Sequence, residues 1–193
     1  TAQRIPVITL VTDVLRSTRI AYVGMDNRAV GATAAYLMAR WMRHVAGDVL
    51  VITSGTTFEG DGLRELGFRE ALRVEDPGRT VVAVSNSDGL DVTCRRLVAT
   101  ALAKHPGIAA VYSIGGGNRG IVDAFAAAGA TCEVFVAHDL DEANRTLLLS
   151  GHLSAVLHHD LRSDMRAMAR VVMSFHGAIP EFRPRRSAIG VIT

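Results

Sequence analysis

The chain has 193 residues, of which 49% are hydrophobic and 21% are charged. These values exclude a disordered or fibrous protein, and the length allows one or two domains with a buried core. The 21 basic side chains are nearly balanced by 19 acidic ones, and this net charge of +2 argues against a strongly basic surface for nucleic acid. No apolar run reaches the roughly 18 residues that a transmembrane helix requires.

The predicted elements alternate along the chain. Short runs rich in Val and Ile predict strands, and longer segments with apolar residues at helical spacing predict helices. In chain order they are strand 7–11, strand 22–25, helix 28–45, strand 49–52, strand 81–84, helix 91–104, strand 109–112, helix 119–128, strand 134–137, helix 141–150, strand 154–157 and helix 162–175. Continuous apolar strands are typical of parallel sheets covered on both faces. The expected fold class is therefore α/β, with doubly wound parallel sheets.

Local signals mark the ends and faces of several helices. Asp91 is the expected N-cap of the helix at 91–104, and Gly129 and Gly151 stand where left-handed C-caps belong. In the last helix, Met165 and Met173 share an apolar stripe at helical spacing. Methionine fills irregular gaps in cores, so we expect this stripe to be core packing rather than a cofactor site.

The sequence gives no strong signal for a metal ion or a cofactor, and neither is predicted. Cys94 and Cys132 match no metal-binding or redox spacing, and we expect both to be small, buried, reduced side chains. The run His158-His159-Asp160 suggests a metal site, but neighbouring side chains diverge, and no second pair with metal-ligand spacing accompanies it. We expect these residues to be polar groups of a cleft.

In open α/β sheets, ligands bind beyond the carboxyl ends of the strands. The segments that follow the predicted strands are rich in Asp, Asn, Arg and His, which pair well with the hydroxyl groups of a polar ligand. These segments are 12–13, 26–27, 53–64, 85–88, 113–118, 138–139 and 158–160.

The loop at 115–120, Gly-Gly-Gly-Asn-Arg-Gly, matches the spacing of a dinucleotide-binding motif, and Asp139 ends the next strand. One interpretation is a nucleotide-dependent enzyme. The alternative is that the glycines let Asn118 and the helix N-terminus approach a polar ligand. A lone glycine motif late in the chain is a weak signal, so we favour the second interpretation and expect no enzyme.

Four stretches carry a resemblance to a known family, and they keep its order. They are 5–10 (IPVITL), 23–31 (VGMDNRAVG), 63–72 (LRELGFREAL) and 105–112 (HPGIAAVY). With them the chain resembles the effector-binding domain of the lac-repressor (LacI) family, which has the type 1 periplasmic-binding-protein fold. The resemblance implies a helix at the third stretch and a two-lobed protein with a ligand cleft between the lobes.

The resemblance also implies how the chain is divided. One lobe is complete and the other is present in part, since the family's domain begins with further strand–helix units and a DNA-binding helix-turn-helix. We expect a partial N-terminal lobe at 1–45, a C-terminal lobe at 46–177 and a C-terminal return segment at 178–193.

Five residues are implied as ligand-binding by the same resemblance. Arg64 is expected to grip ligand hydroxyls, and Asp139 is expected to be the carboxylate after a cleft-facing strand. Asn118 belongs to the loop that replaces the family's usual polar loop. His159 is expected to line the cleft near the last crossover, and Asp13 is expected to be the contribution of the first lobe.

The function that follows is effector sensing in a bacterial transcriptional regulator. The expected ligand is a sugar or a similar small polar molecule, and its binding controls a DNA-binding domain that this chain lacks. A cytoplasmic homodimer is expected, because paired operator half-sites match a two-fold symmetric protein. The alternative is the periplasmic sugar-binding protein of an ABC transporter.

Overall fold

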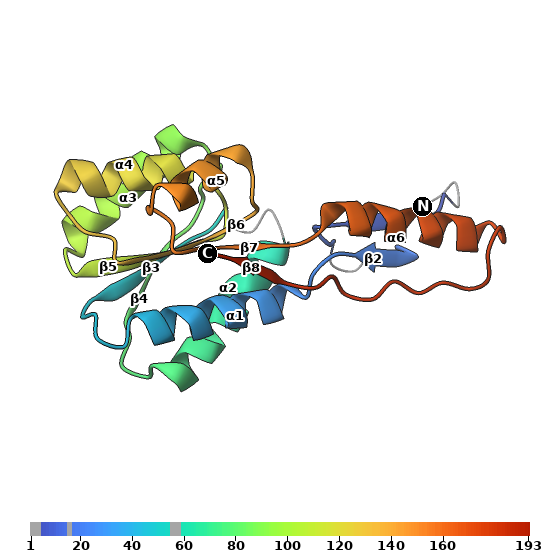
Figure 1. The fold of residues 1–193 in the computed structure, drawn as a ribbon, viewed down its shortest axis with the longest axis horizontal. Coiled ribbons are helices and arrows are strands. Elements are labelled where there is room, and N and C mark those ends of the chain that lie inside the picture. The colour runs from blue at the N-terminus through green and yellow to red at the C-terminus, as the bar shows by residue number, and fades with distance from the viewer. Residues whose placement is uncertain (1–4, 15–16, 55–58) are drawn as a thin grey trace.

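The computed structural model describes residues 5–14, 17–54 and 59–193. In chain order its elements are β1 (Ile8–Leu10), β2 (Ala21–Val23), α1 (Asn27–Trp41), β3 (Asp48–Ile52), α2 (Glu59–Glu75), β4 (Val81–Val84), α3 (Asp91–Lys104), β5 (Ile108–Ser113), α4 (Asn118–Ala128), β6 (Val134–His138), α5 (Glu142–Leu149), β7 (Ala155–His158), α6 (Leu161–Phe175) and β8 (Gly190–Ile192). They form a larger unit and a smaller, elongated one (Figure 1). No described helix is long and apolar enough to cross a membrane.

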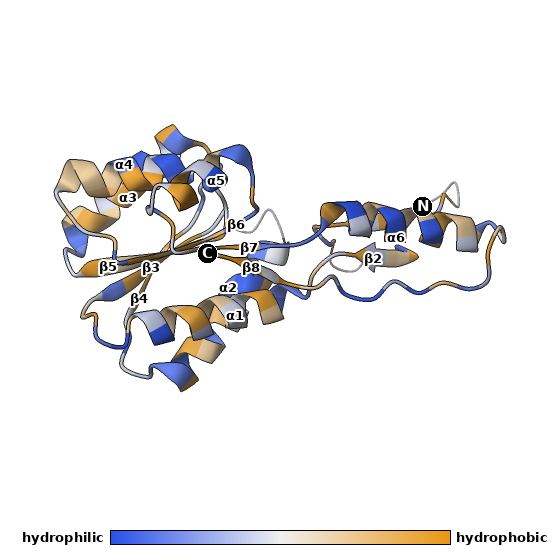
Figure 2. Cartoon of the chain, in the orientation of Figure 1, coloured by the Kyte–Doolittle hydropathy of each residue, from blue (hydrophilic) through white to orange (hydrophobic). Residues whose placement is uncertain are grey.

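The larger unit is built on a six-stranded sheet with the order β4-β3-β5-β6-β7-β8. All pairs in it are parallel except β7–β8, in which the last strand runs antiparallel. The strands are its most apolar segments (Figure 2), as expected for a sheet covered on both faces. The predicted α/β fold class is confirmed.

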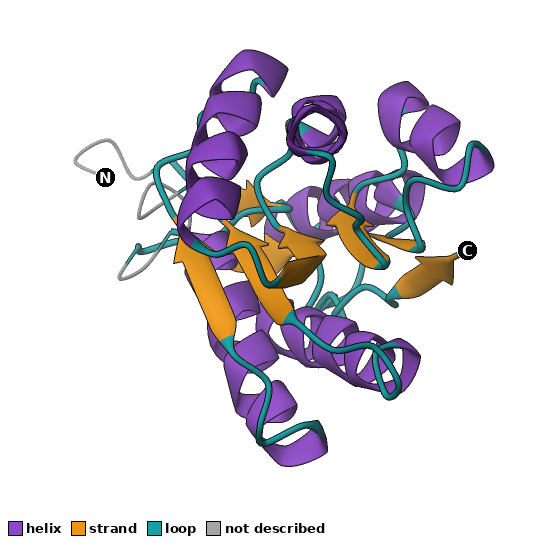
Figure 3. Cartoon of the chain, turned by 90° about the vertical axis from the view of Figure 1, so that its left-hand side faces the viewer, coloured by secondary structure: helices purple, strands orange, loops and turns teal. Residues whose placement is uncertain are grey.

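Helices cover both faces of this sheet (Figure 3). Because successive side chains of a strand point to opposite faces, alternate residues of each strand enter different cores. Val49 and Val51 of β3 pack with α1 and α2, whereas Leu50 and Ile52 pack with α3, α4 and α5.

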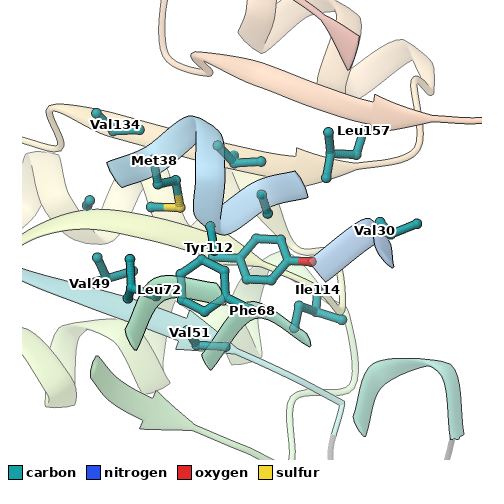
Figure 4. Packing of buried hydrophobic residues seen from close by; sticks show 14 of the residues in the cluster. Val30, Met38, Val49, Val51, Phe68, Leu72, Tyr112, Ile114, Val134 and Leu157 are labelled. Atoms are coloured by element: carbon teal, nitrogen blue, oxygen red, sulfur yellow. The ribbon is translucent and has the colours of Figure 1, made fainter. Parts of the chain in front are cut away.

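An aromatic pair lies at the centre of the first core. The rings of Phe68 from α2 and Tyr112 from β5 are stacked, with centroids 4.7 Å apart and planes 24° apart (Figure 4). Both side chains are fully buried. Stacked aromatic pairs add specific geometry to area burial, so this pair fixes α2 against the sheet.

The smaller unit contains β1, β2 and α6. β1 and β2 form a parallel two-stranded sheet, and α6 packs against both strands. The chain crosses between the units after β2, after β7 and along the return segment, where Met25 and Ser187 form an isolated bridge.

The packing divides the chain differently from the expected boundaries at residues 45 and 177. α1 belongs to the larger unit, because Val30, Ala34 and Met38 are buried in its first core. α6 belongs to the smaller unit. Hydrophobic spacing shows that a helix has an apolar face, but it does not show which sheet that face meets.

The methionine stripe of α6 is not core, which corrects the prediction. Met165 and Met173 are each 45% exposed, and the buried residues of this helix are Asp164 and Val171. The helix has only a two-stranded sheet to cover, so several of its apolar side chains remain partly exposed.

Asp91 is not the N-cap of α3. The cap position is Leu90, and Asp91 is the first helical residue, where its Oδ1 accepts a hydrogen bond from the backbone N–H of Gly120 in α4 (3.2 Å). The predicted cap at Gly129 is confirmed, because it closes α4 with a left-handed backbone (φ 61°). Gly151 has φ 75° and follows the cap residue Ser150 of α5.

Candidate functional site

A cavity of about 250 Å³ lies where the two units meet, at the carboxyl ends of the strands. Val11 and Thr12 line it from the smaller unit. The residues that line it from the larger unit follow β3, β5 and β6 or belong to α2, namely Ser54, Gly60, Asp61, Arg64, Ile114, Gly115, Gly116 and Asp139.

Arg64 is the one cationic side chain among the described residues that line this cavity. The residue is only 7% exposed, and its Nε donates a hydrogen bond to Oδ1 of Asn27 (2.9 Å). Among the described residues, none accepts a hydrogen bond from the terminal nitrogens of Arg64, Nη1 and Nη2, and none forms an ion pair with them. A guanidinium presents its N–H donors in a rigid fork, so a ligand or water in the cavity can accept hydrogen bonds from these nitrogens.

A close crossing of α1 and α2 holds Arg64 in this place. A Cβ on Gly31 would lie 1.9 Å from the carbonyl oxygen of Arg64, and a Cβ on Gly67 would lie 2.0 Å from that of Arg28. Only glycine permits such an approach of two helix backbones. The ion pair of Arg28 with Glu70 (2.7 Å) joins the same two helices.

Asp61 lies one helical turn before Arg64 and lines the same cavity. Its Oδ2 accepts hydrogen bonds from the hydroxyl (2.7 Å) and the backbone N–H (3.2 Å) of Ser54. Its Oδ1 has no hydrogen bond to a described residue. Asp61 therefore fixes the end of β3 beside the cavity.

Asp139 follows β6 and is exposed to the cavity, and its carboxylate has no partner among the described residues. Its backbone is left-handed (φ 64°), and its carbonyl oxygen accepts a hydrogen bond from Nδ2 of Asn144 (2.7 Å). Val11, on the opposite wall, is also left-handed (φ 64°). A β-branched residue is rare in this region, and such strain is common at functional sites.

The predicted residues Arg64 and Asp139 thus lie at one cavity, whereas the other three do not line it. Asp13 is committed to the smaller unit: its Oδ2 pairs with Arg19 (2.6 Å) and its Oδ1 accepts from Thr9 (2.8 Å). Its neighbour Thr12 lines the cavity instead.

Asn118 and His159 are buried among protein partners. Nδ2 of Asn118 donates to Oδ1 of Asn144 (2.7 Å), the residue that holds the Asp139 carbonyl, so Asn118 supports the loop after β6. Nδ1 of His159 is hydrogen bonded to Oδ2 of Asp164 (2.5 Å), and Oδ1 of Asp164 accepts from Ser187. This network joins α6 to the return segment at the crossing between the units.

Thr12 and Asp61 line the cavity as well, although neither was predicted as a site residue. Asp61 has a recognisable signal, because a carboxylate three residues before Arg64 shares its helix face. Thr12 has none, since adjacent residues after a strand are equally plausible until the turn is known.

Helix packing explains two glycines of the loop at 115–120, Gly117 and Gly120. A Cβ on Gly117 would lie 2.3 Å from Sγ of Cys94, and one on Gly120 would lie 1.9 Å from the carbonyl oxygen of Asp91. These glycines bring α4 against α3. Within the described residues, no cluster of His, Cys, Asp or Glu could hold a metal ion.

A larger hollow of about 500 Å³ lies in the smaller unit, between β2 and the return segment. Three of its lining residues are arginines. Arg19 is paired with Asp13 and Arg183 with Glu181, while Arg186 stacks on the ring of Tyr22 (4.6 Å to the centroid). The hollow lies away from the strand ends that carry Arg64 and Asp139, so we assign the candidate site to the smaller cavity.

Comparison with known proteins agrees with this geometry. Residues 1–175 match the family described as periplasmic binding protein domain. The chain belongs to this family. No curated sequence matches the chain.

Solved periplasmic binding proteins share its architecture. GanP, a glucose-galactose binding protein from Geobacillus stearothermophilus, is 25% identical, with a TM-score of 0.88 over 99% of this chain and 68% of its own. The sugar-binding protein of a sugar ABC transporter from Bacillus halodurans is also 25% identical, with a TM-score of 0.82 over 98% of this chain and 69% of its own. The fructose-binding periplasmic domain of a hybrid two-component system is 21% identical and shows the fold alone, with a TM-score of 0.87 over 99% of this chain and 64% of its own. The chain thus spans about two thirds of the length of these periplasmic binding proteins.

Proposed function

We propose that this periplasmic binding protein domain binds a small carbohydrate in the cavity between its two units. The observation that carries the proposal is Arg64, a buried residue that lines the cavity and whose terminal nitrogens meet no described protein acceptor. A rigid fork of N–H donors suits a pair of neighbouring hydroxyl oxygens. Similar solved structures, a glucose-galactose binding protein among them, support the same ligand class.

The charges at the cavity favour a neutral sugar. The carboxylates of Asp61 and Asp139 line it together with the single guanidinium of Arg64. Carboxylate oxygens only accept hydrogen bonds, so they suit the O–H donors of a sugar and repel a second carboxylate. The volume of about 250 Å³ lies below the roughly 300–1,000 Å³ of pockets for drug-sized ligands, which suits a monosaccharide.

The direct test is calorimetric titration with D-glucose, D-galactose, D-fructose and D-arabinose. We expect saturable binding of at least one of them, which Arg64→Ala weakens roughly 10- to 150-fold but leaves measurable. Arg69→Ala is the matched control, because Arg69 lies on the same helix and pairs with Glu65 away from the cavity. Absence of binding for all four sugars, or equal affinity in Arg64→Ala, would contradict the proposal.

Two observations favour different roles for the binding event. The order of the four stretches that resemble the LacI family favours a cytoplasmic, homodimeric transcriptional regulator, whose DNA-binding part lies outside this chain. The similar structures include sugar-binding proteins of ABC transporters, which favours uptake. Fractionation of cells that produce the full-length protein separates the two: a regulator is cytoplasmic and binds DNA, and a transport receptor is exported.

A further inference from the structure

We propose that Asn27 is a positioning residue for ligand binding, which fixes the guanidinium plane of Arg64 at the cavity. Asn27 is the first residue of α1 and does not line the cavity itself. It is 5% exposed, and its Oδ1 accepts the hydrogen bond from Nε of Arg64 (2.9 Å). One test of this inference measures ligand binding and rests on the proposed carbohydrate function. The other measures the hydrogen bond at Nε of Arg64 and does not depend on that function.

Asn27 holds Arg64 by its Nε atom, and this determines the orientation of the guanidinium group. The Nε–H lies in the plane of the guanidinium group, so a fixed acceptor at Nε sets the orientation of that plane. The bond leaves Nη1 and Nη2 for the cavity. A long, flexible side chain loses rotamer freedom when it binds a ligand, and prior restraint by Asn27 lowers that cost.

Asn27 is itself held from several sides. Asp26 caps α1 by accepting hydrogen bonds from the backbone N–H groups of Arg28 and Ala29 (both 3.1 Å), so the helix begins at Asn27. A Cβ on Gly60 would lie 3.2 Å from Nδ2 of Asn27, so only a small residue fits comfortably opposite the amide. The close crossing of α1 and α2 at Gly31 and Gly67 then keeps Asn27 and Arg64 in register.

The same amide reaches the opposite wall of the cavity. Nδ2 of Asn27 lies 3.5 Å from the hydroxyl of Tyr22, a long contact. That hydroxyl donates toward the carbonyl oxygens of Val11 (2.9 Å) and Met25 (3.1 Å). Val11 is the left-handed residue that lines the cavity from the smaller unit. Asn27 thus lies behind the cavity, between a ligand-facing group of each unit.

Two variants of Asn27 test its role. Asn27→Ala removes the acceptor, whereas Asn27→Asp keeps an oxygen of the same reach. Proton exchange at Nε of Arg64, followed by NMR and assigned by its disappearance in Arg64→Ala, reports the bond without any ligand. We expect fast exchange in Asn27→Ala and protection in both wild type and Asn27→Asp. Circular dichroism establishes that each variant is folded.

The ligand readout uses whichever of D-glucose, D-galactose, D-fructose and D-arabinose the wild type binds. We expect Asn27→Ala to weaken binding about 10-fold, Asn27→Asp to remain within about 3-fold of wild type, and Asn27→Ala to have no further effect in an Arg64→Ala background. Protection that persists in Asn27→Ala, equal weakening in both variants, or the same loss without Arg64 would overturn the inference. If none of the sugars binds, the proposed function fails, and the exchange at Nε alone decides the role of Asn27.

Discussion

The hydroxyl of Tyr112 and Nε2 of His138 are hydrogen bonded, 2.8 Å apart, within the larger unit. Both side chains are buried. Burial raises the pKa of Tyr112, and burial, followed by the charges of Arg64 and His159, lowers the pKa of His138 well below its ordinary value. Both side chains are therefore neutral at neutral pH, and neither adds a charge near Arg64.

This pair predicts a loss of stability in mild acid. In the unfolded chain His138 takes up a proton near its ordinary pKa of about 6.5, but in the native protein it does not. The unfolded state then binds more protons, so the contribution is intact above pH 6.5 and is lost as the pH falls below it. We expect a decrease of up to about 1.4 kcal/mol per pH unit from this group, measured by urea unfolding between pH 7 and pH 5.

His138→Gln is the matched variant for this pH dependence. Glutamine keeps a polar partner for the Tyr112 hydroxyl but does not titrate. As the pH falls, its free energy of unfolding is expected to decrease less steeply than that of the wild type. The two slopes are expected to differ by up to about 1.4 kcal/mol per pH unit, the value for one proton. Identical slopes in the two proteins would contradict this prediction, because they would show that native His138 takes up its proton as readily as the unfolded chain does.

The helix crossing beside Arg64 gives a stability prediction. Gly31→Ala places a methyl group 1.9 Å from the carbonyl oxygen of Arg64, and backbone cannot move aside cheaply. We expect a loss of roughly 1–3 kcal/mol or more in the free energy of unfolding, measured by chemical denaturation.

Gly62→Ala on α2 is the control for this substitution. Nothing lies within 4 Å of the added Cβ, and Gly62 lies in an ordinary helical conformation. Alanine has the higher helix propensity, so a gain of roughly 0.5–1 kcal/mol is expected. A gain for both substitutions would mean that α1 and α2 do not cross as closely as the structure shows.

Asp139 gives a prediction about ligand charge. Asp139→Asn removes the negative charge but keeps a residue that tolerates the left-handed backbone at φ 64°. A charge-assisted hydrogen bond contributes about 1.5–3 kcal/mol, so neutral-sugar affinity is expected to fall roughly 10- to 150-fold. Titrations of D-galactose and D-galacturonate into both proteins measure this change. We expect the wild type to bind D-galactose more tightly than D-galacturonate, and the ratio of the two affinities to be smaller in the variant. A wild type that prefers the acid sugar would contradict the assignment of Asp139 to the site.

Much of the fold could be predicted because its signals are local. Apolar runs and helical spacing gave strands and helices close to those observed, and their alternation gave the doubly wound sheet. The return strand β8 has only three residues, Gly190–Ile192, and carries too short a pattern to be predicted. The partners of α1 and α6 could not be predicted either, since an amphipathic helix does not encode which sheet it covers.

The site was harder to predict than the fold for a related reason. Position after a strand indicates the right edge of the sheet, but it does not show whether a side chain meets solvent or another residue. Asn118 is bonded to Asn144, which lies 26 positions further along the chain, and His159 to Asp164. The first pairing depends on tertiary structure, whereas the second depends on how the chain turns into α6. The choice between Thr12 and Asp13 depends in the same way on the left-handed turn at Val11.

The two cysteines give a final prediction, concerning thiol reactivity. Burial raises the pKa of Cys132 to about 12 and also raises the pKa of Cys94, whose Sγ lies 3.0 Å from the hydroxyl of Ser87. Only the thiolate reacts with disulfide reagents, so at pH 8 the fraction available at Cys132 is on the order of 10⁻⁴. We expect Cys132 in folded Cys94→Ser to react at least about 1,000-fold more slowly than free cysteine with Ellman's reagent. Cys94 in folded Cys132→Ser is also expected to react more slowly than free cysteine, and the urea-unfolded wild type is expected to release two equivalents. Cys94→Ser and Cys132→Ser, each with one remaining thiol, identify the source of any fast phase. A fast equivalent from folded Cys94→Ser would show that Cys132 is accessible and that the loop before β6 opens in solution.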